Sequence, residues 1–154
     1  MSSHRLSRVS LDPGSVGVAS PEIEHERQVA IFDLIEKNSF HPEGAEAGPY
    51  ELVLGCEENR LVLEVTGASY GKRHMLSLTP FRTILKDYQI VCESYYEAVR
   101  GASSQQIEAI DMGRRGLHND GAVLLQQRLE GKVAMDHETA RRLFTLVNAL
   151  QRRG

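Results

Sequence analysis

Cysteine is scarce in this sequence, whose 154 residues include only Cys56 and Cys92. The two lie far apart and form no Cys-x-x-Cys pair, so the sequence signals neither a disulfide framework nor a zinc site. We expect both thiols to stay reduced. A chain of this length can bury roughly 70% of the surface that its unfolded form exposes, so it can fold as one domain without disulfides or metal.

Long apolar runs are missing as well. No stretch approaches the roughly 20 consecutive apolar residues that a membrane-spanning helix needs. The opening residues, MSSHRLSRVS, lack the apolar core of a secretory signal. We therefore expect a cytoplasmic protein without a membrane partner.

Basic charge is not in excess. The formal net charge is −3 and the isoelectric point is near 6.1, which argues against a protein dedicated to nucleic acids or to membrane surfaces. Residues 101–154 alone are mildly basic, with 8 Lys or Arg against 6 Asp or Glu. Solvated helix faces produce such a bias by themselves, so the bias identifies no partner.

Recognised catalytic motifs are also absent. The sequence has no Walker A or Gly-x-Gly-x-x-Gly fingerprint and no Gly-x-Ser-x-Gly elbow. Its six histidines show no metal-ligand spacing, and His25 has no second histidine one helical turn away. We therefore assign no catalytic residue, no metal ligand and no cofactor.

Strand signals are present in the first half of the chain. Residues 50–54 and 61–65 alternate between apolar and polar side chains across a turn, which predicts a β-hairpin with one apolar face. A third run at residues 74–78 predicts a further antiparallel strand. Weaker alternation at residues 7–11 suggests a short strand within a strand-and-loop segment, 1–20. The polar residues 38–49 are the best candidate for a mobile loop.

Helix signals occupy most of the remainder. Ser20-Pro21 is typical of an N-cap followed by proline at the first helical position and predicts a helix over residues 21–38. Thr79-Pro80 repeats this signature. The apolar residues that follow it have helical spacing, which predicts one continuous helix over 79–100. They are Phe81, Ile84, Leu85, Tyr88, Val91, Cys92, Tyr95 and Val99.

Shorter helices are expected after Gly101. Ser103 and Gln106 form a possible capping box for a helix that cannot extend far, because glycines stand at 113, 116 and 121. A fourth helix should end at Gly131, and a fifth should begin at Asp136. The prediction is a single α+β domain, 1–154, with a three- to four-stranded antiparallel sheet at 50–79. About five helices pack on it, and the part from 80 to 151 is entirely helical.

Four strings also carry a resemblance: IEHERQVAIFDLIEKNSF at 23–40, LTPFRTILKDYQIVCESYY at 78–96, IEAIDMGRRGLHN at 107–119 and TARRLFTLVNAL at 139–150. With these strings the chain resembles a family of alphaproteobacterial proteins, uncharacterised protein family number zero two six two. The resemblance covers most of the chain and departs in the loop at 41–48 and the turn at 67–71. It implies a single bacterial domain and carries over no activity, ligand or site residue.

The segment DMGRRGLHNDG at 111–121 is the most unusual in the chain. Its three glycines let the backbone approach a ligand closely, and its two arginines suit phosphate or carboxylate. We expect a loop that leads into a helix whose free N–H groups bind anions. The candidate anion-binding residues are Gly113, Arg114, Arg115, Gly116, His118 and Asn119.

A purely structural interpretation of this segment stays open. In that interpretation Gly116 ends one helix and Asn119 or Asp120 caps the next. The two arginines then pair with Asp111 or Glu108.

Three functions are compatible with these patterns. The first is an interaction or regulatory domain without enzymatic activity, with a protein partner; Tyr96 is the aromatic residue free to face it. The second is a protein that binds a small anion or nucleotide through residues 113–121, or an enzyme on a phosphorylated substrate with His118 as acid–base group. The third, RNA or DNA binding, is disfavoured by the acidic composition. It would use the C-terminal arginines Arg114, Arg115, Arg128, Arg141 and Arg142.

Overall fold

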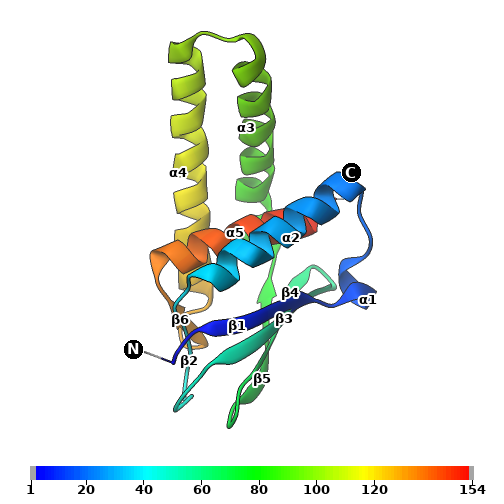
Figure 1. Ribbon diagram of the computed structural model, residues 1–154, viewed down its shortest axis with the longest axis vertical. Helices are drawn as coiled ribbons and strands as arrows, with labels where there is room; N and C mark the ends of the chain where they lie inside the picture. Colours follow the sequence, from blue (N-terminus) through cyan, green and yellow to red (C-terminus); the bar gives the residue numbers. More distant parts are fainter. Residues whose placement is uncertain (1–2, 153–154) are drawn as a thin grey trace.

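The computed structural model describes residues 3–152 and contains a four-stranded sheet (Figure 1). Its strands lie in the order β1 (Leu6–Leu11), β3 (Tyr50–Glu57), β4 (Arg60–Thr66) and β5 (Gly71–Ser77). The pairs β3–β4 and β4–β5 are antiparallel, as predicted. The fourth strand, β1, pairs parallel with β3, so the α+β sheet is mixed. The chain between β1 and β3, residues 12–49, includes helices. Neighbouring strands can run parallel only when a long connection of this kind returns the chain to the same end of the sheet.

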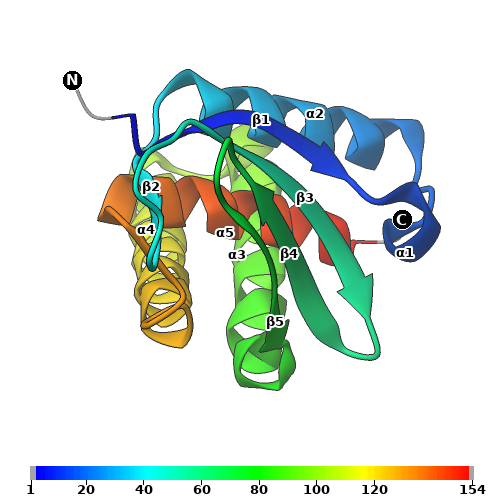
Figure 2. The ribbon, with the colours of Figure 1, turned by 90° about the horizontal axis from the view of Figure 1, so that it is seen from below.

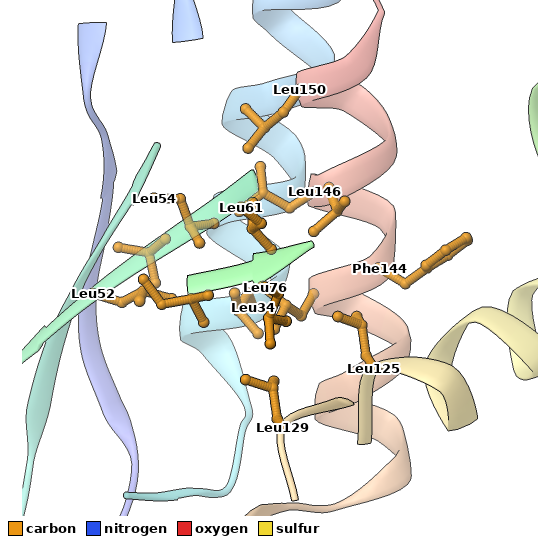
Figure 3. Close-up of a cluster of buried hydrophobic side chains, with 14 of the residues drawn as sticks. Leu34, Leu52, Leu54, Leu61, Leu76, Leu125, Leu129, Phe144, Leu146 and Leu150 are labelled. Atoms are coloured by element: carbon orange, nitrogen blue, oxygen red, sulfur yellow. The ribbon is translucent and has the colours of Figure 1, made fainter. Parts of the chain in front are cut away.

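The apolar face of the hairpin is buried, as its alternation predicts. Two helices, α2 (Pro21–Glu36) and α5 (His137–Gln151), cover this face (Figure 2). Leu34 of α2 and Leu146 of α5 reach the strand leucines in one continuous core (Figure 3). The buried hairpin residues are Tyr50, Leu52 and Leu54 of β3 with Leu61, Leu63 and Val65 of β4.

Both covering helices begin at the predicted caps. The Ser20 hydroxyl accepts a hydrogen bond from the Ile23 amide at 3.3 Å, and proline follows at the first helical position. The Asp136 carboxylate accepts one from the Thr139 amide at 2.8 Å. These local bonds satisfy N–H groups that a helix start leaves open, so they fix where each helix begins.

The predicted helix over 79–100 is confirmed as a 3₁₀ turn, η1 (Thr79–Phe81), that continues into α3 (Arg82–Gly101). Thr79 does not cap this helix, and its hydroxyl accepts a hydrogen bond from the side-chain Nδ2 of Asn59 at 3.0 Å. Leu85 and Tyr88 are buried, whereas Cys92 is only half-buried. Val99 is 55% exposed, because the end of α3 extends beyond the sheet (Figure 1).

Helix α4 (Ser104–Arg128) lies beside α3, and the two form a projecting arm (Figure 1). Its capping box is confirmed: Ser103 and Gln106 exchange hydrogen bonds of 3.2 and 3.1 Å. The predicted break at the glycines is wrong, because α4 runs through them. Each glycine costs about 1 kcal/mol in a helix, which packing against α3 and α5 outweighs here. No helix within residues 3–152 is long and apolar enough to cross a membrane.

A second, two-stranded sheet was not predicted. Strand β2 (Phe40–Pro42) pairs antiparallel with β6 (Val133–Met135). The first strand lies in the segment that was expected to be a loop, and the second lies in the part that was expected to be entirely helical. Strands of three residues are too short to show alternation, and their partners are distant in sequence. The remaining element, α1 (Pro13–Val16), is a single helical turn.

Candidate functional site

The six anion-site residues predicted from the sequence lie within a helix and not in a loop. Inside α4 the backbone N–H groups are bonded along the helix, so they are not available to a ligand. The second helix start that was expected near Asn119 is absent, because the two predicted helices are one helix that begins after the predicted cap Ser103. Gly116 therefore does not end a helix, and neither Asn119 nor Asp120 caps one.

Two of these six residues, Arg114 and His118, approach aromatic rings of α3. The Arg114 guanidinium carbon lies 4.2 Å from the Tyr95 ring centre, and the His118 and Tyr88 ring centres are 5.4 Å apart. The other four are exposed: Gly113, Arg115, Gly116 and Asn119, whose Oδ1 lies 3.4 Å from His137 Nε2 of α5.

Both arginines share one carboxylate, as the structural interpretation anticipated. Arg114 donates to Asp111 Oδ1 from Nε at 3.1 Å and from Nη2 at 2.5 Å. Arg115 Nε lies 3.2 Å from Asp111 Oδ2. These contacts, the hydrogen bond from Arg114 above all, lower the pKa of Asp111. The positive charge of this segment is thus partly neutralised within α4 itself.

His118 connects α4 to α5. Its Nε2 lies 2.8 Å from the Arg141 carbonyl oxygen, which can only accept, so Nε2 carries the proton and donates. Its Nδ1 accepts from Arg141 Nη2 at 3.3 Å. Burial lowers the pKa of His118, which favours the neutral ring. With both nitrogens engaged, His118 positions two helices and is poorly placed for acid–base chemistry.

A pocket of about 320 Å³ lies beside this network, between α2, α3 and α5, with Arg114 of α4 at its side. Its buried surface includes Tyr88, Ala30 and Asn148. Its exposed mouth includes Val29 and Tyr96, the latter 62% exposed. Pockets that bind small molecules measure about 300–1,000 Å³ and combine apolar walls with a few polar groups, as this one does.

Asn148 is the buried polar residue of this pocket. Its side chain is 8% exposed, and its Oδ1 has no hydrogen-bond partner among residues 3–152. An unsatisfied buried acceptor costs about 1–3 kcal/mol. Rotating the amide by a half-turn exchanges its oxygen and nitrogen, so either atom can face the pocket. The pocket thus contains a hydrogen-bonding group that no described neighbour satisfies.

Tyr88 and Cys92 also line the pocket. Burial raises the pKa of both side chains; for Cys92, a hydrogen bond from Tyr88 and the charge of Arg114 oppose this rise. Both groups therefore stay protonated at neutral pH, and the thiolate that would act as a nucleophile is disfavoured. Cys92 forms no disulfide with Cys56.

Charged residues surround the mouth of the pocket. Glu26 forms an ion pair with Arg152, and both line the pocket. Asp33 of α2 and Glu93 of α3 line it without an ion pair to any residue in the described range. Within that range, no three His, Cys, Asp or Glu side chains are grouped to hold a metal ion.

Comparison with known proteins identifies the family. Residues 3–153 match the family described as Uncharacterised protein family (UPF0262). The chain belongs to this family. A UPF0262 protein of Phenylobacterium zucineum is 59% identical over 98% of this chain and 95% of its own length. One from Caulobacter vibrioides is 56% identical with the same coverage, and one from Xanthobacter autotrophicus is 59% identical over 99% of this chain and 94% of its own.

These relatives come from alphaproteobacteria, so the resemblance found in the sequence is confirmed. No solved structure is significantly similar to the chain.

Sequence reasoning singled out two residues that line the pocket, Arg114 for anion binding and Tyr96 for a protein partner, and missed Asn148, Asp33 and Glu93. Asn148 did leave a signal, because it is a polar residue within the apolar string TLVNAL at 145–150. A buried polar side chain in such a string needs a partner, and its lack of one in the chain directs attention to a ligand. The two carboxylates left no comparable signal, because exposed acids are common on helices.

Proposed function

We propose that this chain is a cytoplasmic small-molecule-binding domain, which acts by binding and not by catalysis. The ligand would occupy the pocket between α2, α3 and α5. Such a domain fits the interaction or regulatory role expected from the sequence, with the bound molecule as the signal.

One observation carries this proposal: Asn148 lines the pocket, is only 8% exposed and has no partner for Oδ1 among the described residues. A protein gains no stability from such a group, whereas a bound molecule gains a directional hydrogen bond. Four of the groups whose pKa is shifted also lie in or beside this pocket, a clustering typical of functional sites. They are Tyr88, Cys92, Arg114 and His118.

The same pKa shifts favour binding over catalysis. Tyr88 and Cys92 are held protonated by burial, so they can donate hydrogen bonds but are poor nucleophiles or bases. His118, the sequence-based candidate for acid–base chemistry, is neutral and bonded through both ring nitrogens.

The test uses four six-carbon probes that differ only in their polar group: hexylamine, hexanol, hexanamide and hexanoate. At matched ionic strength, a probe that binds only the folded protein raises Tm. We expect at least one probe to raise the Tm of the wild type and to leave that of Asn148→Leu unchanged.

The substitution Asn148→Leu keeps the size of the side chain and removes its amide. Replacing an unsatisfied polar group by an apolar one of similar shape is neutral or stabilising, so the unliganded variant should melt at the wild-type temperature or higher. Asn119→Leu, on the exposed face of α4 and outside the pocket, is the matched control and should keep the probe-dependent shift. Equal shifts in the wild type and Asn148→Leu, or no shift with any probe, would refute the proposal.

The other functions considered from the sequence remain predictions. Phosphate in the same Tm assay tests anion binding by Arg114 and Arg115, and their double replacement by alanine should abolish any shift that phosphate causes. A protein partner would be identified by pull-down from native lysate and mass spectrometry. Nucleic-acid binding gains no support, because Asp111 pairs with these two arginines and Glu138 with Arg141.

A further inference from the structure

We propose that the ligand of this pocket is an organic cation, an ammonium or guanidinium group on a short apolar body. This inference rests on the proposed binding function and adds its chemical class. Three features of the described residues support it: the charges at the mouth, the aromatic ring beside them and the buried amide of Asn148.

The charges favour a cation. Two arginines line the pocket, but each is paired with a carboxylate, Arg114 with Asp111 and Arg152 with Glu26. Two further carboxylates line it without such a pair, one from each of the facing helices α2 and α3: Asp33 and Glu93. An incoming anion would have to compete with Asp111 or Glu26 for its arginine, whereas a cation meets two acids with no competing positive partner.

The aromatic ring at the mouth favours the same class of ligand. Tyr96 is 62% exposed although it lines the pocket, and its ring is edge-on to Tyr95 at 6.1 Å between centres. An aromatic ring open to solvent attracts a cation through its quadrupole. Val29, on the opposite helix, offers an apolar surface for the body of the ligand.

The buried amide supplies an observation independent of the acids. Asn148 Oδ1 has no described partner, and an amide oxygen can only accept a hydrogen bond. Turned so that its oxygen faces the pocket, the amide accepts a hydrogen bond from an N–H donor, and ammonium and guanidinium groups bring several. A hydrogen bond from a charged donor is roughly twice as strong as a neutral one. The amide thus indicates a ligand, and the acids and the ring select a cation.

The experiment measures Kd for hexylamine, hexanol and hexanoate with the full chain by calorimetry at 0.15 M salt. The two exposed carboxylates and the ring each add a small attraction for a cation, so hexylamine should bind at least about fivefold more tightly than hexanol. Hexanoate should bind more weakly than hexanol. Higher salt should reduce the preference for the amine, because salt screens exposed charges.

Variants assign this preference to the two acids. The double change Asp33→Asn with Glu93→Gln should weaken hexylamine binding by about two- to thirtyfold and leave hexanol binding unchanged. Both positions are exposed, so the variant should fold normally. Glu51→Gln is the control: this exposed acid lies on the face of β3 opposite the core, so the sheet separates it from the pocket.

The outcomes separate this inference from the function on which it rests. A preference for hexylamine that the double variant reduces and the control retains supports the cation. Tighter binding of hexanol or hexanoate, still dependent on Asn148, overturns the cation and leaves small-molecule binding in place. A preference for hexylamine that the double variant leaves undiminished also overturns it. Binding of no probe overturns both proposals.

Discussion

Two glycines of α4 should respond in opposite ways to the same substitution. A Cβ at Gly121 would lie 2.5 Å from the Cε1 and Cζ atoms of Phe144, far inside contact distance. The Phe144 ring is fully buried against Tyr88 and His118, with ring centres 5.4 and 6.1 Å away, so it has little room to move. A Cβ at Gly116 would meet no atom within 4 Å.

The magnitudes follow from two opposing effects. Alanine is favoured over glycine in a helix by about 1 kcal/mol. Forcing an extra carbon into a packed core costs about 1–3 kcal/mol, and the contact at Gly121 is severe enough to reach the upper value. Gly116→Ala should therefore stabilise by up to about 1 kcal/mol, and Gly121→Ala should destabilise by about 2 kcal/mol. In a chain of this size each kcal/mol shifts Tm by about 2–4 °C.

Thermal unfolding followed by circular dichroism at 222 nm, together with urea denaturation, measures both variants. We expect Tm to rise by about 2–4 °C for Gly116→Ala and to fall by about 4–8 °C for Gly121→Ala. Adding Phe144→Leu to Gly121→Ala should restore part of the stability relative to the sum of the single changes, because the smaller side chain admits the new carbon. If Gly121→Ala were as stable as Gly116→Ala, the close contact of α4 with α5 would be wrong.

Three further predictions concern the core, the thiols and the shared carboxylate. Leu85→Ala should lower the free energy of unfolding by about 2–5 kcal/mol in urea, since Leu85 is only 6% exposed; a loss under about 0.5 kcal/mol would contradict its burial. Titration of the denatured protein without reductant should find two thiols, Cys56 and Cys92, and finding none would indicate a disulfide. The pKa of Asp111 is lowered in the folded state, so its stabilising effect is present above the usual value near 3.8 and is lost as the pH falls below it. Asp111→Asn should thus lose less stability between pH 5 and pH 2 than the wild type does, as followed by urea denaturation, and identical pH profiles would argue against the ion pairs with Arg114.

Local patterns in the sequence determined the elements whose form depends on nearby residues. The hairpin of β3 and β4 and the apolar stripe of α3 were predicted because side-chain direction repeats every two residues in a strand and about every 3.6 in a helix. The caps at Ser20, Ser103 and Asp136 were predicted for a similar reason, since each hydrogen bond spans only three residues.

Contacts between distant segments decided the rest. From the sequence alone, Gly121 was expected to interrupt a helix. In the structure the Phe144 ring, 23 positions later, occupies the space that a Cβ would need, so glycine is favourable there. Strand β2 exists because β6, about 90 residues away, pairs with it. The pocket likewise draws Asp33, Glu93 and Asn148 from three helices. The sequence shows that each of these residues is polar, and only the packing of α2, α3 and α5 determines that they face one cavity.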